Sequence, residues 1–385
     1  MSPTDQSGVR GIRARDLGIT VGAGVPGPYN GITDVPGVAV GHCTLLEGDG
    51  PLRVGTGPVR TGVTVVLPHQ DGMWRQAVYA GSHRLNGNGE LTGLEWVRES
   101  GLLTSPVGLT NSHSVGTVRD GLVLAEIAAR PQGLYWSLPV VGETWDGLLN
   151  DINGLHVRPE HVAEALATAS VGPVAEGAVG GGTGMVCHGF KGGIGTASRV
   201  VPEASGGYTV GVLVQANHGR RERLTVNGAP VGRALSADVV PLPVPPEAHL
   251  PTEGAGSILV VIGTNAPLLP HQCIRLAQRA TIGVARTGGT GEHFSGDLFL
   301  AFATGNRPVP SGYGLPQAVT QTVQVLSDGH VDALFDATVE ATEEAILNCL
   351  VAAHTTTGRD GVTAHALPTD LLVAALDRHN LRRLD

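Results

Sequence analysis

Short runs of apolar and β-branched residues recur along the chain, and each is bounded by turn-forming residues such as glycine, proline or aspartate. Runs of this kind between turn signals are typical of β-strands. On this pattern we predict strands at Val38–Val40, Gly62–Leu67, Gly108–Thr110, Tyr208–Ala216 and Ser257–Gly263.

Other segments place apolar residues three and four positions apart, which is the spacing of one face of an α-helix. One of them opens with Pro159 and Glu160, and proline is favoured at the first position of a helix. Strands come first, then helices, then strands again, so the order favours a layered α+β fold over strict βαβ alternation. The predicted helices are Arg119–Arg130, His161–Ala169, Pro270–Arg286, Asp332–Ala353 and Leu367–Leu376.

Hydrophobic residues make up 41% of the 385 residues, which is enough to bury a sizeable core and excludes general disorder. At roughly 150 residues per domain the length allows two or three domains, although large layered sheets also reach this size as one. Charged residues are only 15%, against about 25% in an average domain. We therefore expect the chain to bury much of its surface, including contacts between subunits.

The net charge of −9 and the absence of any block of lysine and arginine disfavour nucleic-acid binding. The first residues contain no apolar signal segment, and no run of 18 apolar residues predicts a membrane span. We therefore expect a cytoplasmic protein that binds neither nucleic acid nor membrane. Four cysteines lie far apart without metal or redox spacing, and we expect buried thiols of a reducing compartment at Cys43, Cys187, Cys273 and Cys349.

The segment Asp238–Gly256 holds five prolines and can be neither a helix nor a central strand. A linker between domains is the plain interpretation of such a segment. It ends, however, in Gly254-Ala255-Gly256 and runs directly into a strongly β-forming run that starts at Ser257. A self-cleaving N-terminal nucleophile requires such an arrangement, because the new α-amine then lies beside the hydroxyl that it activates. The pattern alone leaves both interpretations open.

Several longer motifs extend over nearly the whole chain. They are Asn30–Val38, Val40–His42, Gly57–Thr64, Leu85–Glu90, Thr110–Gly116, Val140–Thr144, Asp146–Gly154, Gly180–Met185, Leu213–Gly219 and the stretch from Gly288 to Asp297. Together they resemble the P1-family peptidases, the group of L-aminopeptidase/D-esterases and β-aminopeptidases (peptidase S58 type) that is related in fold to ornithine acetyltransferases. No single motif is specific, but the combination is.

The resemblance implies an α+β fold, an αββα four-layer sandwich of the N-terminal-nucleophile type related to ornithine acetyltransferase. Residues 1–385 would form a single catalytic domain. The precursor would cut itself between Gly256 and Ser257, which gives a larger chain 1–256 and a smaller chain 257–385. Processed pairs in this family commonly assemble further, so the resemblance also implies a homotetramer.

The resemblance assigns the nucleophile to Ser257, whose hydroxyl is weakly nucleophilic at its free pKa and needs activation. The family supplies a second serine and a carboxylate on a later loop, and these match Ser295 and Asp297. We expect this pair to orient and polarise the nucleophile. The general base is either the pair itself or the freed α-amine of Ser257, whose reference pKa is about 7.7–8.0.

An acyl-transfer reaction also needs hydrogen-bond donors for the developing oxyanion. By resemblance, Asn217 lies in the family's oxyanion motif, and its amide can donate two hydrogen bonds. Trp145 stands where the family has a tyrosine as the second donor, so it either donates through its indole N–H or lines the pocket. Glu143 matches a carboxylate that anchors the free amine of the substrate, as an aminopeptidase requires.

Without the resemblance, the same residues have plainer interpretations. Ser295 and Asp297 are typical of a turn. Asn217 is typical of the end of a strand, and Glu143 of a solvated loop. The family match is therefore what favours functional roles for these four residues.

No metal ion or other cofactor is expected. The glycine-rich run at Gly177–Gly184 lacks a phosphate-binding pattern, so close backbone packing is its favoured interpretation. The 15 histidines include no HExxH pair. Hydrogen-bonded structural or pocket roles are therefore assigned to His42, His83, His113, His188 and His293.

The leading functional hypothesis is an aminopeptidase that removes N-terminal residues from short peptides, amides or esters through an acyl-enzyme at Ser257. The second is an acyltransferase on the same scaffold, although that group uses threonine where this chain has Ser257. The third is an uncleaved homologue that binds ligands without catalysis. The sequence leaves the substrate open among α-L-aminoacyl, D-alanyl and β-aminoacyl compounds.

Overall fold

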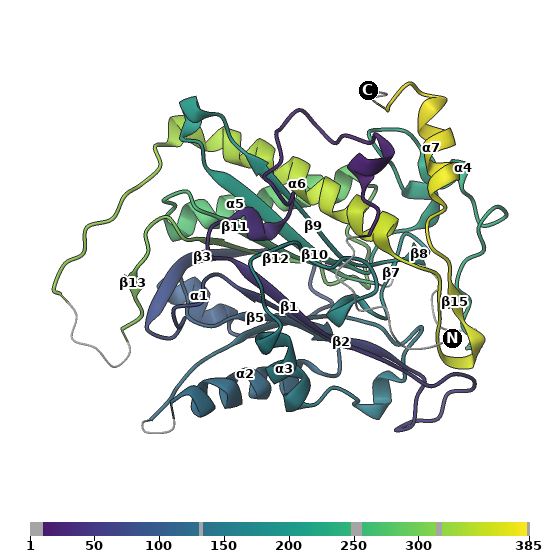
Figure 1. Ribbon diagram of the computed structural model, residues 1–385, viewed down its shortest axis with the longest axis horizontal. Coiled ribbons are helices and arrows are strands. Elements are labelled where there is room, and N and C mark those ends of the chain that lie inside the picture. Colours follow the sequence, from purple (N-terminus) through teal and green to yellow (C-terminus); the bar gives the residue numbers. More distant parts are fainter. Residues whose placement is uncertain (1–10, 131–133, 248–255, 313–317, 383–385) are drawn as a thin grey trace.

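Two β-sheets lie face to face, and helices cover their outer faces (Figure 1). The computed structural model describes residues 11–130, 134–247, 256–312 and 318–382. The residues Gly254 and Ala255, which precede the expected cleavage site, lie outside the described residues.

The larger sheet has seven strands in the order β13-β3-β12-β11-β10-β9, with β4 paired to β3. All its neighbours are antiparallel except β11 and β12, which run parallel. The strands are β3 (Gln76–Arg84), β4 (Leu102–Leu103), β9 (Gly193–Val200), β10 (Thr209–Ala216), β11 (Ile258–Thr264), β12 (Leu298–Ala303) and β13 (Val309–Pro310).

The smaller sheet has four strands in the order β1-β2-β5-β6, of which only β5 and β6 run parallel. Its strands are β1 (Ala39–Glu47), β2 (Val59–Leu67), β5 (Val107–Asn111) and β6 (Val140–Thr144). Two short hairpins lie outside both sheets, namely β7 (Val186–Cys187) with β8 (Phe190–Lys191), and β14 (Thr356–Thr357) with β15 (Thr363–Ala364).

A helix lies at each of the five predicted segments, and two further short α-helices among the described residues, α1 (Leu94–Ser100) and α4 (Val231–Ala234), were not predicted. The largest difference in a start is at the segment expected from Arg119, whose helix starts four residues before it, at Val115. No helix in the described part of the chain is long and apolar enough to cross a membrane. The helices are α1 (Leu94–Ser100), α2 (Val115–Ala129), α3 (Pro159–Ala167), α4 (Val231–Ala234), α5 (Pro270–Arg286), α6 (Val331–Ala352) and α7 (Thr369–Asp377).

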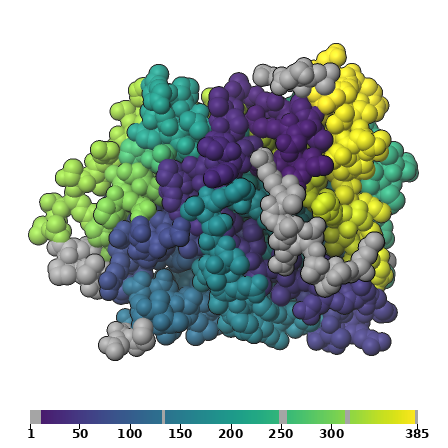
Figure 2. Space-filling model, viewed as in Figure 1, coloured from purple at the N-terminus to yellow at the C-terminus, as the bar shows by residue number. Residues whose placement is uncertain are grey.

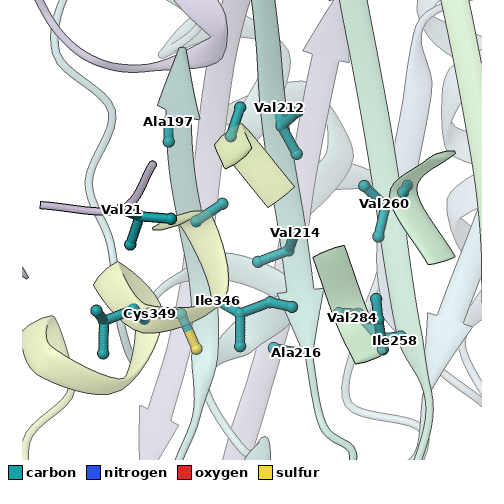
Figure 3. Packing of buried hydrophobic residues seen from close by; sticks show 14 of the residues in the cluster. Val21, Ala197, Val212, Val214, Ala216, Ile258, Val260, Val284, Ile346 and Cys349 are labelled. Carbon is teal, nitrogen blue, oxygen red and sulfur yellow. The ribbon is translucent and has the colours of Figure 1, made fainter. Parts of the chain in front are cut away.

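The alternation of side chains along the central strands creates the layers. On β10, Val212 and Val214 point to the helix side, where they pack with Ile346 of α6, as Figure 3 shows. Leu213, between them, points the other way, into the core between the two sheets. This is the two-residue period of a strand that is buried on both faces.

The smaller sheet repeats this arrangement on its own outer face. Val63 and Val65 of β2 pack with Val118 of α2 and Val162 of α3. The order of layers is therefore α5 and α6, the larger sheet, the smaller sheet, then α2 and α3. The predicted αββα sandwich is confirmed. All four cysteines are buried free thiols, as expected.

Candidate active site

Ser257 lies at the start of β11, in the middle of the larger sheet. Its backbone carbonyl accepts a hydrogen bond from the Asn217 amide (3.0 Å), which continues the β10–β11 pairing by one step. Its side-chain Oγ accepts a hydrogen bond from the Gly296 amide (2.9 Å). Only 4% of Ser257 is exposed. The predicted strand is confirmed from Ile258 onward, and the serine stands immediately before it.

Gly256 is packed directly against the neighbouring strand end. A Cβ atom at this position would lie 1.5 Å from the Asn217 carbonyl oxygen and 2.8 Å from its Nδ2. Real Cβ atoms do not approach backbone oxygens so closely, so only glycine fits before Ser257. The peptide bond expected to be cut is therefore held against Asn217.

Ser295 and Asp297 lie on the loop that leads into β12. Because β11 and β12 are parallel neighbours, their first residues meet at the same edge of the sheet, and this brings the loop to Ser257. The Ser295 hydroxyl donates to Asp297 Oδ1 (2.5 Å), and the amide of Ile258 donates to the same oxygen (3.2 Å). Ser295 and Asp297 are both buried. The structure thus brings the predicted pair to the backbone beside Ser257, the predicted nucleophile.

Asn86 completes the surroundings of Asp297. It follows the end of β3, which is antiparallel to β12 and so ends where β12 begins. Its Nδ2 donates to Asp297 Oδ2 (3.1 Å), and its Oδ1 accepts from the Asp297 amide (2.6 Å). Burial raises the pKa of Asp297 to about 6, against the opposing effect of the hydrogen bonds from Ser295, Ile258 and Asn86.

Asn217 stands just beyond the end of β10, and its side-chain amide is held at both ends. Its Oδ1 accepts from the Val186 amide (2.7 Å), and its Nδ2 donates to the Trp145 carbonyl (2.8 Å). A side-chain amide nitrogen has two hydrogens. One of them is engaged by the Trp145 carbonyl, and the nitrogen lies close to Gly256, where a Cβ atom would come within 2.8 Å of it.

A pocket of about 280 Å³ opens beside Ser257. Its walls come from the ends of β5 and β6 and from the loops that follow β3 and precede β12. The lining residues are Asn88, Gly89, Glu90, Ser112, Glu143, Trp145, Ser257 and Phe294.

Glu143 is the buried carboxylate of this pocket, whereas Glu90, which also lines it, is exposed. Its Oε1 accepts from the Glu90 amide (3.0 Å), and its Oε2 accepts from the Ser112 hydroxyl. Burial raises the pKa of the carboxyl, while these two hydrogen bonds act in the opposite direction. Among the described residues, no lysine, arginine or histidine forms a salt bridge with Glu143. A cationic ligand would therefore supply the missing counter-charge.

Trp145 contributes to the site in two ways. Its backbone carbonyl holds Asn217, and its half-buried ring lines the pocket. The ring lies against Gly147, where a Cβ atom would come within 2.8 Å of the indole Nε1. The indole thus lines the pocket beside Ser257, and its role as a second oxyanion donor stays a prediction.

Lys191 is a residue behind the site that the sequence did not single out as functional. Its buried Nζ donates to the carbonyl oxygens of Gly182 (3.2 Å), Met185 (2.8 Å) and Gly192 (2.8 Å). Burial lowers its pKa to about 7. These bonds fix the hairpin whose Val186 amide holds Asn217.

Asn86 and Ser112 were also not assigned roles from the sequence. Both lie within motifs that carried the family resemblance, Leu85–Glu90 and Thr110–Gly116, so a signal was present. Their partners are Asp297 and Glu143, which are distant in sequence and become neighbours only through strand pairing.

Known proteins with the same fold and a similar sequence cover nearly the whole chain. A model of peptidase family S58 matches residues 30–364. The β-peptidyl aminopeptidase BapA of Sphingosinicella microcystinivorans is 50% identical over 381 residues, which are 97% of this chain and 93% of that protein. A Burkholderia sp. β-aminopeptidase structure has a TM-score of 0.86 and 54% identity, covering 95% of this chain and 99% of its own.

A further solved structure bears on the fold. The L-aminopeptidase D-Ala-esterase/amidase of Ochrobactrum anthropi has a TM-score of 0.87 and 42% identity, covering 96% of this chain and 99% of its own. It is described as a serine aminopeptidase with a new variant of the N-terminal-nucleophile (Ntn) hydrolase fold. The predicted fold class is thereby confirmed.

Proposed function

The chain belongs to peptidase family S58 and is an aminopeptidase, and we propose that Ser257, freed as an N-terminus by self-cleavage, is its nucleophile. The observation that carries the proposal is a single pocket that holds Ser257 together with the buried carboxylate of Glu143, which has no salt-bridge partner among the described residues. The acyltransferase and the non-catalytic homologue are not favoured, because the relatives are aminopeptidases.

Self-cleavage uses the same hydroxyl and the same oxyanion donor as hydrolysis, but takes place before the α-amine of Ser257 exists. The Ser257 hydroxyl attacks the Gly256 carbonyl carbon, and the peptide C–N bond breaks as the ester forms and the nitrogen takes a proton. Water then opens the ester, which leaves chains 1–256 and 257–385. The close packing of Gly256 against Asn217 supports this step, because it keeps the amide beside the carbonyl that becomes an oxyanion.

In the processed enzyme, Ser257 attacks the carbonyl carbon of the substrate and forms an acyl-enzyme. We assign the proton transfer to the freed α-amine, whose reference pKa of about 7.7–8.0 suits a base at neutral pH. Asp297 Oδ1 is already engaged by the Ser295 hydroxyl and the Ile258 amide, so this pair positions the N-terminal residue. The leaving amine departs with the transferred proton, and water hydrolyses the ester.

The substrate class we propose is a short peptide or amide with a free N-terminal β-amino acid. Two relatives, at 50% and 54% identity, are a β-peptidyl aminopeptidase and a β-aminopeptidase, which supports β-aminoacyl substrates. The test is a panel of p-nitroanilides carrying β-alanyl, L-alanyl and D-alanyl groups. We expect the β-alanyl compound to have the highest kcat/KM. If the L-alanyl or D-alanyl compound had the highest value instead, the proposed substrate class would be wrong.

The Glu143 carboxylate is expected to select substrates with a free amine. Glu143→Gln keeps the shape and the acceptor for Ser112 but removes the charge that pairs with the ammonium group. We expect kcat/KM for free-amine anilides to fall at least about ten-fold, or roughly 1.4 kcal/mol. Steady-state kinetics on β-alanyl p-nitroanilide measures this change.

The matched control for this prediction is the N-acetyl anilide. It carries no ammonium group, so wild type should hardly cleave it and Glu143→Gln should alter that residual rate far less. Equal cleavage of both substrate classes by wild type would make the enzyme a general amidase. An equal effect of the substitution on both classes would remove Glu143 from amine recognition.

Asp297 is expected to set the acid limit of self-cleavage, because the α-amine that acts as base in turnover does not exist before the cut. Its pKa is raised to about 6, so the rate of chain cutting, followed on denaturing gels, should fall as the pH drops through that value. Asn86→Ala removes a donor that lowers this pKa, so this acid limb should move to higher pH. Asn88→Ala is the control, since Asn88 donates to the Phe294 carbonyl instead. If the acid limb of the pH profile did not move in Asn86→Ala, a group other than Asp297 would set that limb.

A homotetramer of processed pairs in the cytoplasm completes the proposal. The segment 318–327 before α6 projects from the edge of the molecule, as Figures 1 and 2 show, and its exposed Val319, Val323 and Val325 offer apolar surface to another subunit. Four free buried thiols support a reducing compartment.

A further inference from the structure

A cysteine and two histidines gather behind the active site, on the helix side of the larger sheet. Cys187 ends β7, His188 follows it, and His218 comes two residues after β10. One candidate ligand atom from each lies within 4.8 Å of the other two, and all three residues are buried. The His188 amide donates to the His218 carbonyl (2.7 Å), which fixes the two segments together.

The His188 imidazole has a ring nitrogen without a partner. Its Nδ1 contacts the Arg220 carbonyl (3.1 Å), which can only accept, so Nδ1 carries the hydrogen and Nε2 carries a lone pair. That Nε2 is buried and has no hydrogen-bond partner among the described residues. Buried polar atoms without partners are rare and call for a ligand.

One distance within the cluster is close to that between two ligands of the same metal ion. Cys187 Sγ lies 3.8 Å from His218 Nδ1, close to the separation of a sulfur and a nitrogen bound to one tetrahedral ion at about 2.3 Å and 2.0–2.1 Å. The contact from His188 Nδ1 to the Arg220 carbonyl is the kind of outer contact that orients a ligating histidine. Thiolate and imidazole are ligands that select zinc over calcium or magnesium.

We propose that Cys187, His188 and His218 bind one Zn²⁺ ion. The Cys187 thiol loses its proton to solvent as the zinc–sulfur bond forms, and His188 binds through Nε2. This revises the expectation of no metal, which rested on the absence of a sequence motif. The ligands come from two segments about thirty residues apart, which only the packing of the β7–β8 hairpin against the end of β10 brings together.

The ion would support the oxyanion donor without contacting the substrate. His218 directly follows Asn217, and Cys187 directly follows Val186, whose amide holds Asn217 Oδ1. Zinc would therefore join the two segments that position Asn217. It is a structural ion on this proposal, and none of its three ligands lines the pocket at Ser257.

The experiment measures zinc in the full-length protein purified from zinc-supplemented cells. Elemental mass spectrometry should find about one zinc ion per chain in wild type, and far less in Cys187→Ser and in His218→Asn. Cys273→Ser is the matched control, because Cys273 is an equally buried thiol on α5, outside the cluster, and this variant should keep its zinc. Circular dichroism and intact mass report folding and processing separately.

Wild type alone provides a second readout in case the variants fail to fold. Refolding it with Co²⁺ should give the thiolate-to-cobalt charge-transfer band in the near ultraviolet, and one equivalent of Zn²⁺ should remove the band. Wild type without zinc and without that band would overturn the proposal. Zinc that persists in a folded Cys187→Ser variant would place the ion elsewhere and overturn it equally.

Discussion

Replacing Ser257 by alanine is expected to leave one uncut chain of 385 residues and no measurable aminopeptidase activity. The hydroxyl that would attack the Gly256 carbonyl is removed, and with it the nucleophile that forms the acyl-enzyme. The fold should be retained, since only the hydrogen bond from the Gly296 amide is lost. Denaturing gels and intact mass detect the uncut chain, and a β-alanyl anilide assay detects the activity.

Ser257→Cys is the control for this prediction. It keeps a nucleophile of similar size at the same place, so it should still produce two chains, at a different rate. N-terminal sequencing of the smaller wild-type chain should read Ser-Ile-Leu-Val. A smaller chain that starts elsewhere, or cleavage that continues in Ser257→Ala, would remove Ser257 from the cutting reaction.

The elements that the sequence predicts best are those whose pattern is local. Helix α5 spans Pro270–Arg286 as predicted, because a proline opens it and its apolar residues follow one clear stripe. Strand β11 is likewise visible in the β-forming run after Gly256. In both cases neighbouring residues carry all the information.

Strand β9 (Gly193–Val200) shows why other elements escape prediction. Its glycines lower the strand propensity of the segment, so no strand was predicted there. A Cβ atom at Gly195 would lie 2.0 Å from the Ala345 carbonyl oxygen, so the glycine is what allows α6 to pack directly on the sheet. Ala345, whose carbonyl requires a glycine here, lies about 150 positions later in the sequence, so a local sequence pattern cannot predict this contact.

The same distinction applies to the site. Family resemblance identified Ser257, Ser295 and Asp297, and the parallel pairing of β11 with β12 explains why the loop reaches the nucleophile. The contact of Asn86 with Asp297 spans 211 positions and depends on the register of β3 against β12. Such contacts need the sheet topology, which the sequence pattern did not specify.

Asn217→Ala is expected to lower kcat by about 10²–10³, because one preorganised donor to the oxyanion is lost. KM should change little, since Asn217 does not line the substrate pocket. Self-cleavage should slow as well, because the same amide lies against the Gly256 peptide. Kinetics on β-alanyl anilide and the time course of chain cutting measure the two effects.

A structural cost accompanies this substitution and must be separated from the catalytic one. The Val186 amide and the Trp145 carbonyl each lose a partner, which costs about 1–3 kcal/mol for a buried group. Asn217→Asp separates the contact with Val186 from the loss of the donor: it keeps the acceptor for Val186, but its carboxylate can donate neither to the Trp145 carbonyl nor to the oxyanion. If Asn217 acts on the oxyanion, the Asp variant should be at least as slow as the Ala variant, although its contact with Val186 is retained. A loss confined to KM, or recovery of kcat in Asn217→Asp, would assign Asn217 to substrate binding or to support of the β7–β8 hairpin instead.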